Sequence, residues 1–327
     1  MIRLTAVVLL TLLPASAALG HHGVASLGVA GLEGPGAPIE TANSATLPGR
    51  RFLASLKLDY ASFEKLTQER DDETDFNAYW MYGVGYGATS YLSAYLLIPF
   101  TTKRAEDNSY NTSGFTDLSL MTALGWKYDG GFRLVPESES LDDMEDPHFT
   151  LYGGMTLPTG NENLRAKDGE IDPGMSLGFG APSYSAGLTA TKQVAGRFTF
   201  CGEASWIGFS EHEYADSTKV RFGGEFRLNA ASAARVLLRP ASKLRCDVNL
   251  EANYLQLGRD EVAGVGEQAT GGRILYGVPG LRLFMGSSSV GLGVKVPVWK
   301  SLNEEKEQQG AEGKESYRLI FTFSTLI

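Results

Sequence analysis

The chain has 327 residues, of which 39 are glycine and two are cysteine, and its formal net charge is −9. The acidic balance argues against a nucleic-acid-binding protein, which carries a basic surface. Two cysteines cannot build a disulfide scaffold or a four-cysteine zinc site. The many glycines and the 10% of aromatic residues favour a β-protein with many turns.

Residues 1–20 have the pattern of a cleaved secretory signal peptide. Arg3 supplies the positive start, residues 4–13 form a short apolar core, and Ala-Ser-Ala at 15–17 offers a cleavage site. The alternative is a membrane anchor, but the apolar run is too short to span about 30 Å as a helix. We therefore expect an exported protein, and no later apolar run is long enough for a transmembrane helix.

Residues 21–49 are rich in glycine, alanine and proline and show no sustained period. They are predicted to form an irregular periplasmic lead-in or a plug inside a barrel. The segment begins with His21 and His22, a candidate copper or zinc site. If cleavage follows Gly20, the free amine of His21 would become a third ligand; the alternative is a leader that binds no metal.

From residue 50 to the end at 327, apolar and polar residues alternate in segments of about ten residues, which is the pattern of β-strands. Twelve strands are predicted, at residues 52–60, 76–86, 91–100, 115–128, 149–157, 174–191, 198–206, 220–228, 244–254, 273–284, 290–298 and 317–323. Ten residues is the length that a tilted strand needs to cross a bilayer. Aromatic residues on the apolar faces suit the two interfacial girdles of a membrane barrel.

The connections support an antiparallel, up-and-down transmembrane barrel. Long polar links follow the odd-numbered strands and short links follow most even-numbered ones, as in outer-membrane barrels. The exception is the long acidic link at 129–147. We interpret it as a periplasmic insertion; a missed hairpin there would raise the count to fourteen strands. A soluble exported β-sandwich is the remaining all-β alternative.

Several stretches resemble a bacterial outer-membrane β-barrel family labelled "meta-pathway of phenol degradation", or simply "transporter". They are 113–118 (SGFTDL), 157–160 (LPTG), 171–174 (IDPG), 274–283 (ILYGVPGLRL) and 296–299 (VPVW). The resemblance covers roughly residues 50–327 and implies an outer-membrane channel or uptake protein. It carries over no catalytic residue. The chain ends in Ile327 rather than the aromatic residue that commonly marks such barrels for assembly.

Strand parity places fourteen charged side chains on the inner, lumen-lining face. A bulge at Pro279-Gly280 is expected to keep both arginines of the tenth strand inward. The nine bases exceed the five acids, which suggests either a lumen that favours anionic solutes or a salt-bridged filling. The set is Lys57, Asp59, Glu203, Lys219, Arg221, Glu225, Arg227, Arg245, Asp247, Glu251, Arg273, Arg282, Lys295 and Arg318.

The predicted function is passive passage of small solutes, anionic or aromatic, across the outer membrane. The alternative is a closed structural or adhesive barrel whose loops bind a partner or cations. No enzyme is expected, because none of the four histidines has a serine nearby on one strand face. We expect outer-membrane lipid, a small solute and the barrel-assembly machinery as partners, with no cofactor and no nucleic acid.

Overall fold

The computed structural model describes residues 37–64, 74–105, 111–137, 144–165, 169, 171–304 and 314–327. The predicted signal peptide and the histidines at 21 and 22 lie outside these residues. Within the described part of the chain, no helix is long and apolar enough to cross a bilayer.

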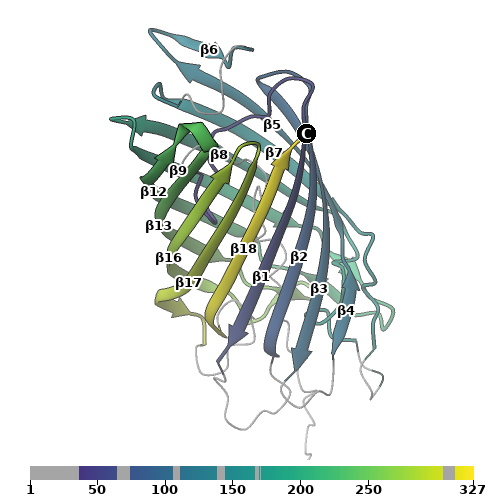
Figure 1. Ribbon diagram of the computed structural model, residues 1–327. Coiled ribbons are helices and arrows are strands. Elements are labelled where there is room, and N and C mark those ends of the chain that lie inside the picture. Colours follow the sequence, from purple (N-terminus) through teal and green to yellow (C-terminus); the bar gives the residue numbers. More distant parts are fainter. Residues whose placement is uncertain are drawn as a thin grey trace, which may run out of the picture.

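Twelve antiparallel strands of the described chain form a closed barrel (Figure 1). Each wall strand pairs with its neighbours along the chain, β1 pairs with β18, and β3 pairs with β5, so the ring of hydrogen bonds is complete. The predicted twelve-stranded barrel is therefore confirmed. The wall consists of β1 (Phe52–Phe63), β2 (Thr74–Gly87), β3 (Leu92–Ala105), β5 (Leu118–Tyr128), β7 (His148–Leu157), β8 (Ser183–Val194), β9 (Phe198–Phe209), β12 (Glu225–Arg239), β13 (Leu244–Leu257), β16 (Gly272–Met285), β17 (Ser288–Leu302) and β18 (Glu315–Leu326).

Shorter elements extend the wall or lie in the loops. β4 (Thr112–Phe115) continues the pairing of β3 beyond β5, and β6 (Phe132–Leu134) forms a short hairpin with the end of β5. This hairpin adds no wall strands, because β7 pairs directly with β5. A separate four-stranded sheet and a 3₁₀ turn, η1, complete the set: β10 (His212–Glu213), β11 (Lys219–Arg221), β14 (Glu261–Val262), β15 (Val265–Gly266) and η1 (Pro240–Ser242).

The strands alternate between an apolar outer face and a polar inner face. Leu188, Leu228 and Leu250 point outward and are 45%, 55% and 62% exposed, whereas alternate residues of the same strands are buried. Outer aromatic rings contact one another across strands, as in the edge-to-face pair Trp80–Phe100 at 5.6 Å. An apolar outer band around a polar interior is the arrangement of a barrel in lipid.

The two rims differ as the sequence predicted. Turns of two to four residues join β2 to β3, β8 to β9, β12 to β13 and β16 to β17 at one rim, which we call the short-turn rim. The links after β1, β3, β7, β9, β13 and β17 are longer and form the loop rim. The long link from β5 to β7 lies at the short-turn rim, where it was expected.

Two strand boundaries differ from the prediction. The sixth strand begins at Ser183 rather than at Gly174, because residues before it pack as a loop against β3 and β4. The eighth runs from Glu225 to Arg239 rather than from 220 to 228. Its middle, residues 230–234, consists of alanine and serine, and these small residues give little contrast between an apolar and a polar face.

Candidate functional site

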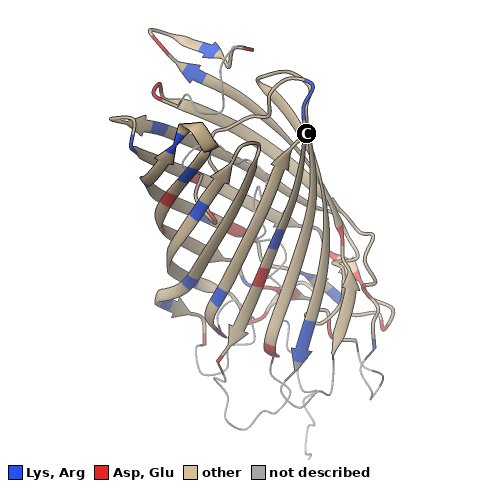
Figure 2. Ribbon diagram, in the orientation of Figure 1, with Lys and Arg blue, Asp and Glu red and all other residues tan. Residues whose placement is uncertain are grey.

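Eleven of the fourteen side chains expected on the inner face lie buried within the barrel. Their residues are at most 9% exposed, and most form ion pairs or hydrogen bonds across the interior. Figure 2 shows that charged positions gather on the wall strands from β9 to β18 and on β1, while β2 and β3 carry few over most of their length. The eleven are Lys57, Asp59, Glu203, Glu225, Arg227, Arg245, Asp247, Glu251, Arg282, Lys295 and Arg318.

Lys219 and Arg221 are not on the barrel wall, so the prediction for them was wrong. Both belong to β11 in the small loop sheet and are exposed. Lys219 pairs with Glu213 at 3.4 Å, and Arg221 pairs with Glu261. The polar and apolar residues do alternate here, because Val220 is buried in the loop cluster while Lys219 and Arg221 are exposed. The alternation therefore does not mark a wall strand facing lipid.

Arg273 points away from the interior, which also corrects the prediction. Alternation through β16 is unbroken: Ile274, Tyr276 and Val278 are buried, and Arg282 follows on the same face. The register of β16 against β13 has no bulge at Pro279, so Arg273 and Arg282 lie on opposite faces. The bulge is instead in the pairing with β17, next to Leu275.

Residues 37–48, which we call the inner segment, run through the interior without regular structure. Their first part is held by Glu251 of β13. This carboxylate accepts hydrogen bonds from the amides of Ile39 (2.5 Å) and Thr41 (2.8 Å) and from the Thr41 hydroxyl (2.7 Å). A carboxylate that receives several donors is a strong anchor, since charged acceptors form stronger hydrogen bonds.

Arg282 holds the beginning of the same segment. Its guanidinium donates to the carbonyl oxygens of Ala37 (3.1 Å) and Pro38 (2.8 Å), and Asn249 also reaches Ala37. Ile39 lies against the backbone of Gly280 and Gly293, where a wall side chain would collide with it. These glycines therefore leave room for the inner segment.

The second part of the inner segment contacts the opposite wall through mostly neutral groups. The Ser44 amide donates to Thr191 (2.9 Å), and the Ser44 hydroxyl lies 2.8 Å from that of Thr189. Thr150 donates to the Ser44 carbonyl at 2.9 Å, and Ser93 accepts from the Leu47 amide at 2.9 Å. The segment is thus hydrogen-bonded to both sides of the barrel.

Glu40 lies farther from the short-turn rim than the two ends of the inner segment. Both ends of the segment contact residues near the short-turn rim: Arg282 is close to the end of β16, and Ser93 is the second residue of β3. Glu40 instead reaches Lys57 and Lys295, farther along β1 and β17. Its carboxylate pairs with both, at 3.0 Å to the Lys295 ammonium, and all three side chains are at most 5% exposed.

The interior charge differs from the expectation. Without Lys219, Arg221 and Arg273, the predicted set contains six bases and five acids, and the carboxylate of Glu40 pairs with two of these bases. No sequence pattern pointed to Glu40, because it lies in a segment with no period. Only its proximity to the lysines identifies it.

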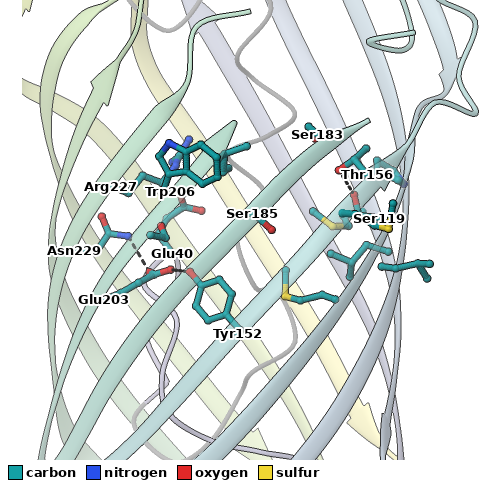
Figure 3. A pocket seen from close by; sticks show the side chains of 18 of the residues that line it. Glu40, Ser119, Tyr152, Thr156, Ser183, Ser185, Glu203, Trp206, Arg227 and Asn229 are labelled. Atoms are coloured by element: carbon teal, nitrogen blue, oxygen red, sulfur yellow. Dashed lines mark hydrogen bonds between the residues drawn. The ribbon is translucent and has the colours of Figure 1, made fainter. Parts of the chain in front are cut away.

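A cavity of about 90 Å³ lies beside Glu40 (Figure 3). Arg227, Lys295 and Glu203 line it on one side; Glu203 accepts hydrogen bonds from Tyr152 (2.5 Å) and Asn229 (2.9 Å). The other side is formed by Met81, Leu97, Met121 and Phe179, with hydroxyl groups from Ser119 and Thr156. The cavity therefore has one ionic wall and one largely apolar wall.

The loop following β7 covers the cavity from the loop rim. Asp117 accepts hydrogen bonds from the amides of Thr159 (3.0 Å), Gly160 (2.8 Å) and Phe179 (2.7 Å), which fixes this loop against the start of β5. Burial raises the pKa of Asp117 above its ordinary value, although these amides act in the opposite direction. Phe179 thereby lines the cavity and also packs in a loop cluster with Tyr214.

Comparison with known proteins finds a matching family and solved structures of similar fold. Residues 70–299 match the family described as "Putative MetA-pathway of phenol degradation". No curated protein matches the chain. An outer membrane channel from Pseudomonas putida F1 has a TM-score of 0.66 and 12% identity over 87% of this chain and 98% of its own.

Two further solved structures are more distant. The translocator domain of autotransporter NalP from Neisseria meningitidis has a TM-score of 0.41 and 11% identity, over 86% of this chain and 89% of its own. The NanC porin has a TM-score of 0.44 and 7% identity, over 83% of this chain and 98% of its own.

Proposed function

We propose a function from one premise: the chain belongs to the family described as "Putative MetA-pathway of phenol degradation", a family of outer-membrane β-barrels. The proposed function is passive passage of small solutes, with a preference for anions, through the barrel. In this proposal the inner segment is a plug that closes the path and must move for solute to pass.

The observation that carries the proposal is the way in which the inner segment is held. The ring of twelve strands is closed by its own hydrogen bonds, so the wall does not need the segment. Most wall groups that touch the segment are polar or charged, and water can solvate them when the segment leaves. A twelve-stranded ring is also wider than the eight-stranded barrels whose interiors side chains alone fill.

A reversible disulfide between the inner segment and the wall tests the proposal. The Ser44 and Thr189 hydroxyl oxygens lie 2.8 Å apart, so Ser44→Cys and Thr189→Cys place two thiols within bonding reach. The variant is made in a chain whose Cys201 and Cys246 are serine, and single-channel conductance is measured in planar bilayers. We expect no conductance when the pair is oxidised and recovery after reduction.

The control is the serine-substituted chain without the new pair, whose conductance should not respond to the reductant. Measurable and equal conductance of the oxidised and reduced pair would show that the inner segment does not close the path.

A closed structural or adhesive barrel is the second candidate, favoured by the ordered packing of the loops. Ile171, Phe179, Tyr214, Val220 and Phe222 form one buried cluster over the loop rim. Such a cap suits a barrel that presents its loops to a partner. Absence of conductance in both redox states of the disulfide variant, at any voltage, would favour this function over the channel.

A further inference from the structure

Glu40 occupies a position that a dissolved carboxylate could take. Its carboxylate lies between the ammonium groups of Lys57 and Lys295, and the Lys295 group also lies 4.5 Å from the centre of the Tyr276 ring. Both lysines are at most 5% exposed. Buried ammonium groups are costly without an anionic partner. Asp59 of the same strand lies 4.0 Å from the Lys57 ammonium, and Glu40 supplies the negative charge beside Lys295.

The Glu40 carboxylate does not itself belong to a wall strand. It belongs to the inner segment, whose residues 37–41 are held by side chains of β13 and β16, while Lys57 and Lys295 come from β1 and β17. When the inner segment moves, the carboxylate leaves and the two lysines remain. A small molecule carrying a carboxylate has the same chemical group and can replace it.

The cavity determines what else the molecule should carry. Lys295 and Glu40 line it together, and Met81, Leu97 and Met121 lie on its other side. A carboxylate at Lys295 would thus place the remainder of the molecule against methionine and leucine side chains. Methionine adapts its shape to different apolar groups, which suits a range of small hydrocarbon bodies.

We infer that Lys57 and Lys295 form a carboxylate-binding site, that Glu40 fills it as a tethered occupant, and that a small organic acid with an apolar body displaces Glu40. This inference rests on the proposed function, because displacement of Glu40 would be coupled to movement of the plug. It names the solute class as monocarboxylates and makes Glu40 their competitor.

Calorimetric titration of the folded, detergent-solubilised protein tests the site with hexanoate, hexanol and hexylammonium. We expect hexanoate to bind and the other two to bind at least tenfold more weakly. Glu40→Gln keeps the side-chain shape and removes the competing charge, so hexanoate should bind about tenfold more tightly to this variant, a difference of about 1.4 kcal/mol. Lys295→Met should abolish hexanoate binding in both backgrounds.

The matched control is Glu261→Gln, which removes an acid from an exposed ion pair in the loop sheet. It should leave hexanoate affinity unchanged, and heat-modifiable migration on gels confirms that each variant is folded. Equal affinity for hexanoate and hexanol, or an unchanged affinity in Glu40→Gln, would overturn the inference.

Uptake of hexanoate into proteoliposomes separates this inference from the proposed function. Hexanoate binding in the expected order without any uptake would support the carboxylate-binding site and contradict the proposed channel function. Uptake that is insensitive to Glu40→Gln and Lys295→Met would support the proposed channel function and contradict the carboxylate-binding site.

Discussion

The two halves of the barrel interior differ in chemistry. The inward faces of β9, β12, β13, β16, β17, β18 and β1, which we call the ionic half, carry the eleven buried charges expected from the sequence. The inward faces of β2, β3, β5, β7 and β8, the hydroxyl half, carry mainly serine, threonine, tyrosine, methionine and glycine. Their buried lysines, Lys103 and Lys127, lie near strand ends.

The inner segment bridges these halves with contacts of different strength. Residues 37–41 face the ionic half, where Glu251, Arg282 and the two lysines make charged contacts. Residues 43–47 face the hydroxyl half mainly through neutral hydrogen bonds. Net contributions are about 1.5–3 kcal/mol for hydrogen bonds to charged groups and about 0.5–1.5 kcal/mol for neutral ones. The ionic half should therefore dominate retention of the segment.

The largest effect is expected for Glu251→Ala, which removes an anchor of the inner segment in the ionic half. The three lost charged hydrogen bonds correspond to at least about 4.5 kcal/mol, or roughly a thousandfold in the population of the released segment. The measurement is the rate at which a water-soluble thiol reagent labels Ala45→Cys, a position now buried at 3% exposure. Glu261→Ala in the loop sheet is the control, and a labelling rate no higher than in that control would contradict the assignment.

An intermediate effect is expected for Gly293→Ala, which adds a methyl group that collides with Ile39 of the inner segment and changes no charge. A Cβ at this position would lie 2.8 Å from Ile39, and its three nearest atoms all belong to Ile39. Overpacking of this kind costs about 1–3 kcal/mol, so labelling of Ala45→Cys should rise by about tenfold. Gly202→Ala is the control, because its nearest atom would be 4.0 Å away; an equal rise there would refute the steric explanation.

The smallest effect is expected for Thr189→Val, which removes one neutral hydrogen bond between the inner segment and the hydroxyl half. The substitution keeps the shape and removes the hydroxyl that lies 2.8 Å from that of Ser44. A loss of about 0.5–1.5 kcal/mol predicts a few-fold increase in the labelling rate. An effect as large as that of Glu251→Ala would mean that the two halves hold the segment equally.

Most of the barrel was predictable because its information is local. Alternation with a period of two, strands of about ten residues and links of two lengths are visible in the chain without knowledge of neighbours. The same alternation predicted an inward direction for Glu203, Asp247 and Arg318, and these residues are buried in the structure. The prediction was wrong at Lys219 and Arg221, because a short loop strand has the same alternation as a wall strand. It was also wrong at Arg273, because Pro279 was expected to form a bulge that the pairing of β16 with β13 does not contain.

The local patterns of the chain are sufficient to predict a barrel of about twelve strands with long loops at one rim, since each strand and turn carries its own pattern. What fills the interior depends instead on contacts that form only in the folded chain. Residues 37–48 have no period, so their path depends on acceptors and donors that belong to distant strands, such as Glu251, Arg282 and Thr191. The pairing of Glu40 with Lys57 and Lys295 arises in the same way, because contacts across 17 and 255 positions leave no local trace.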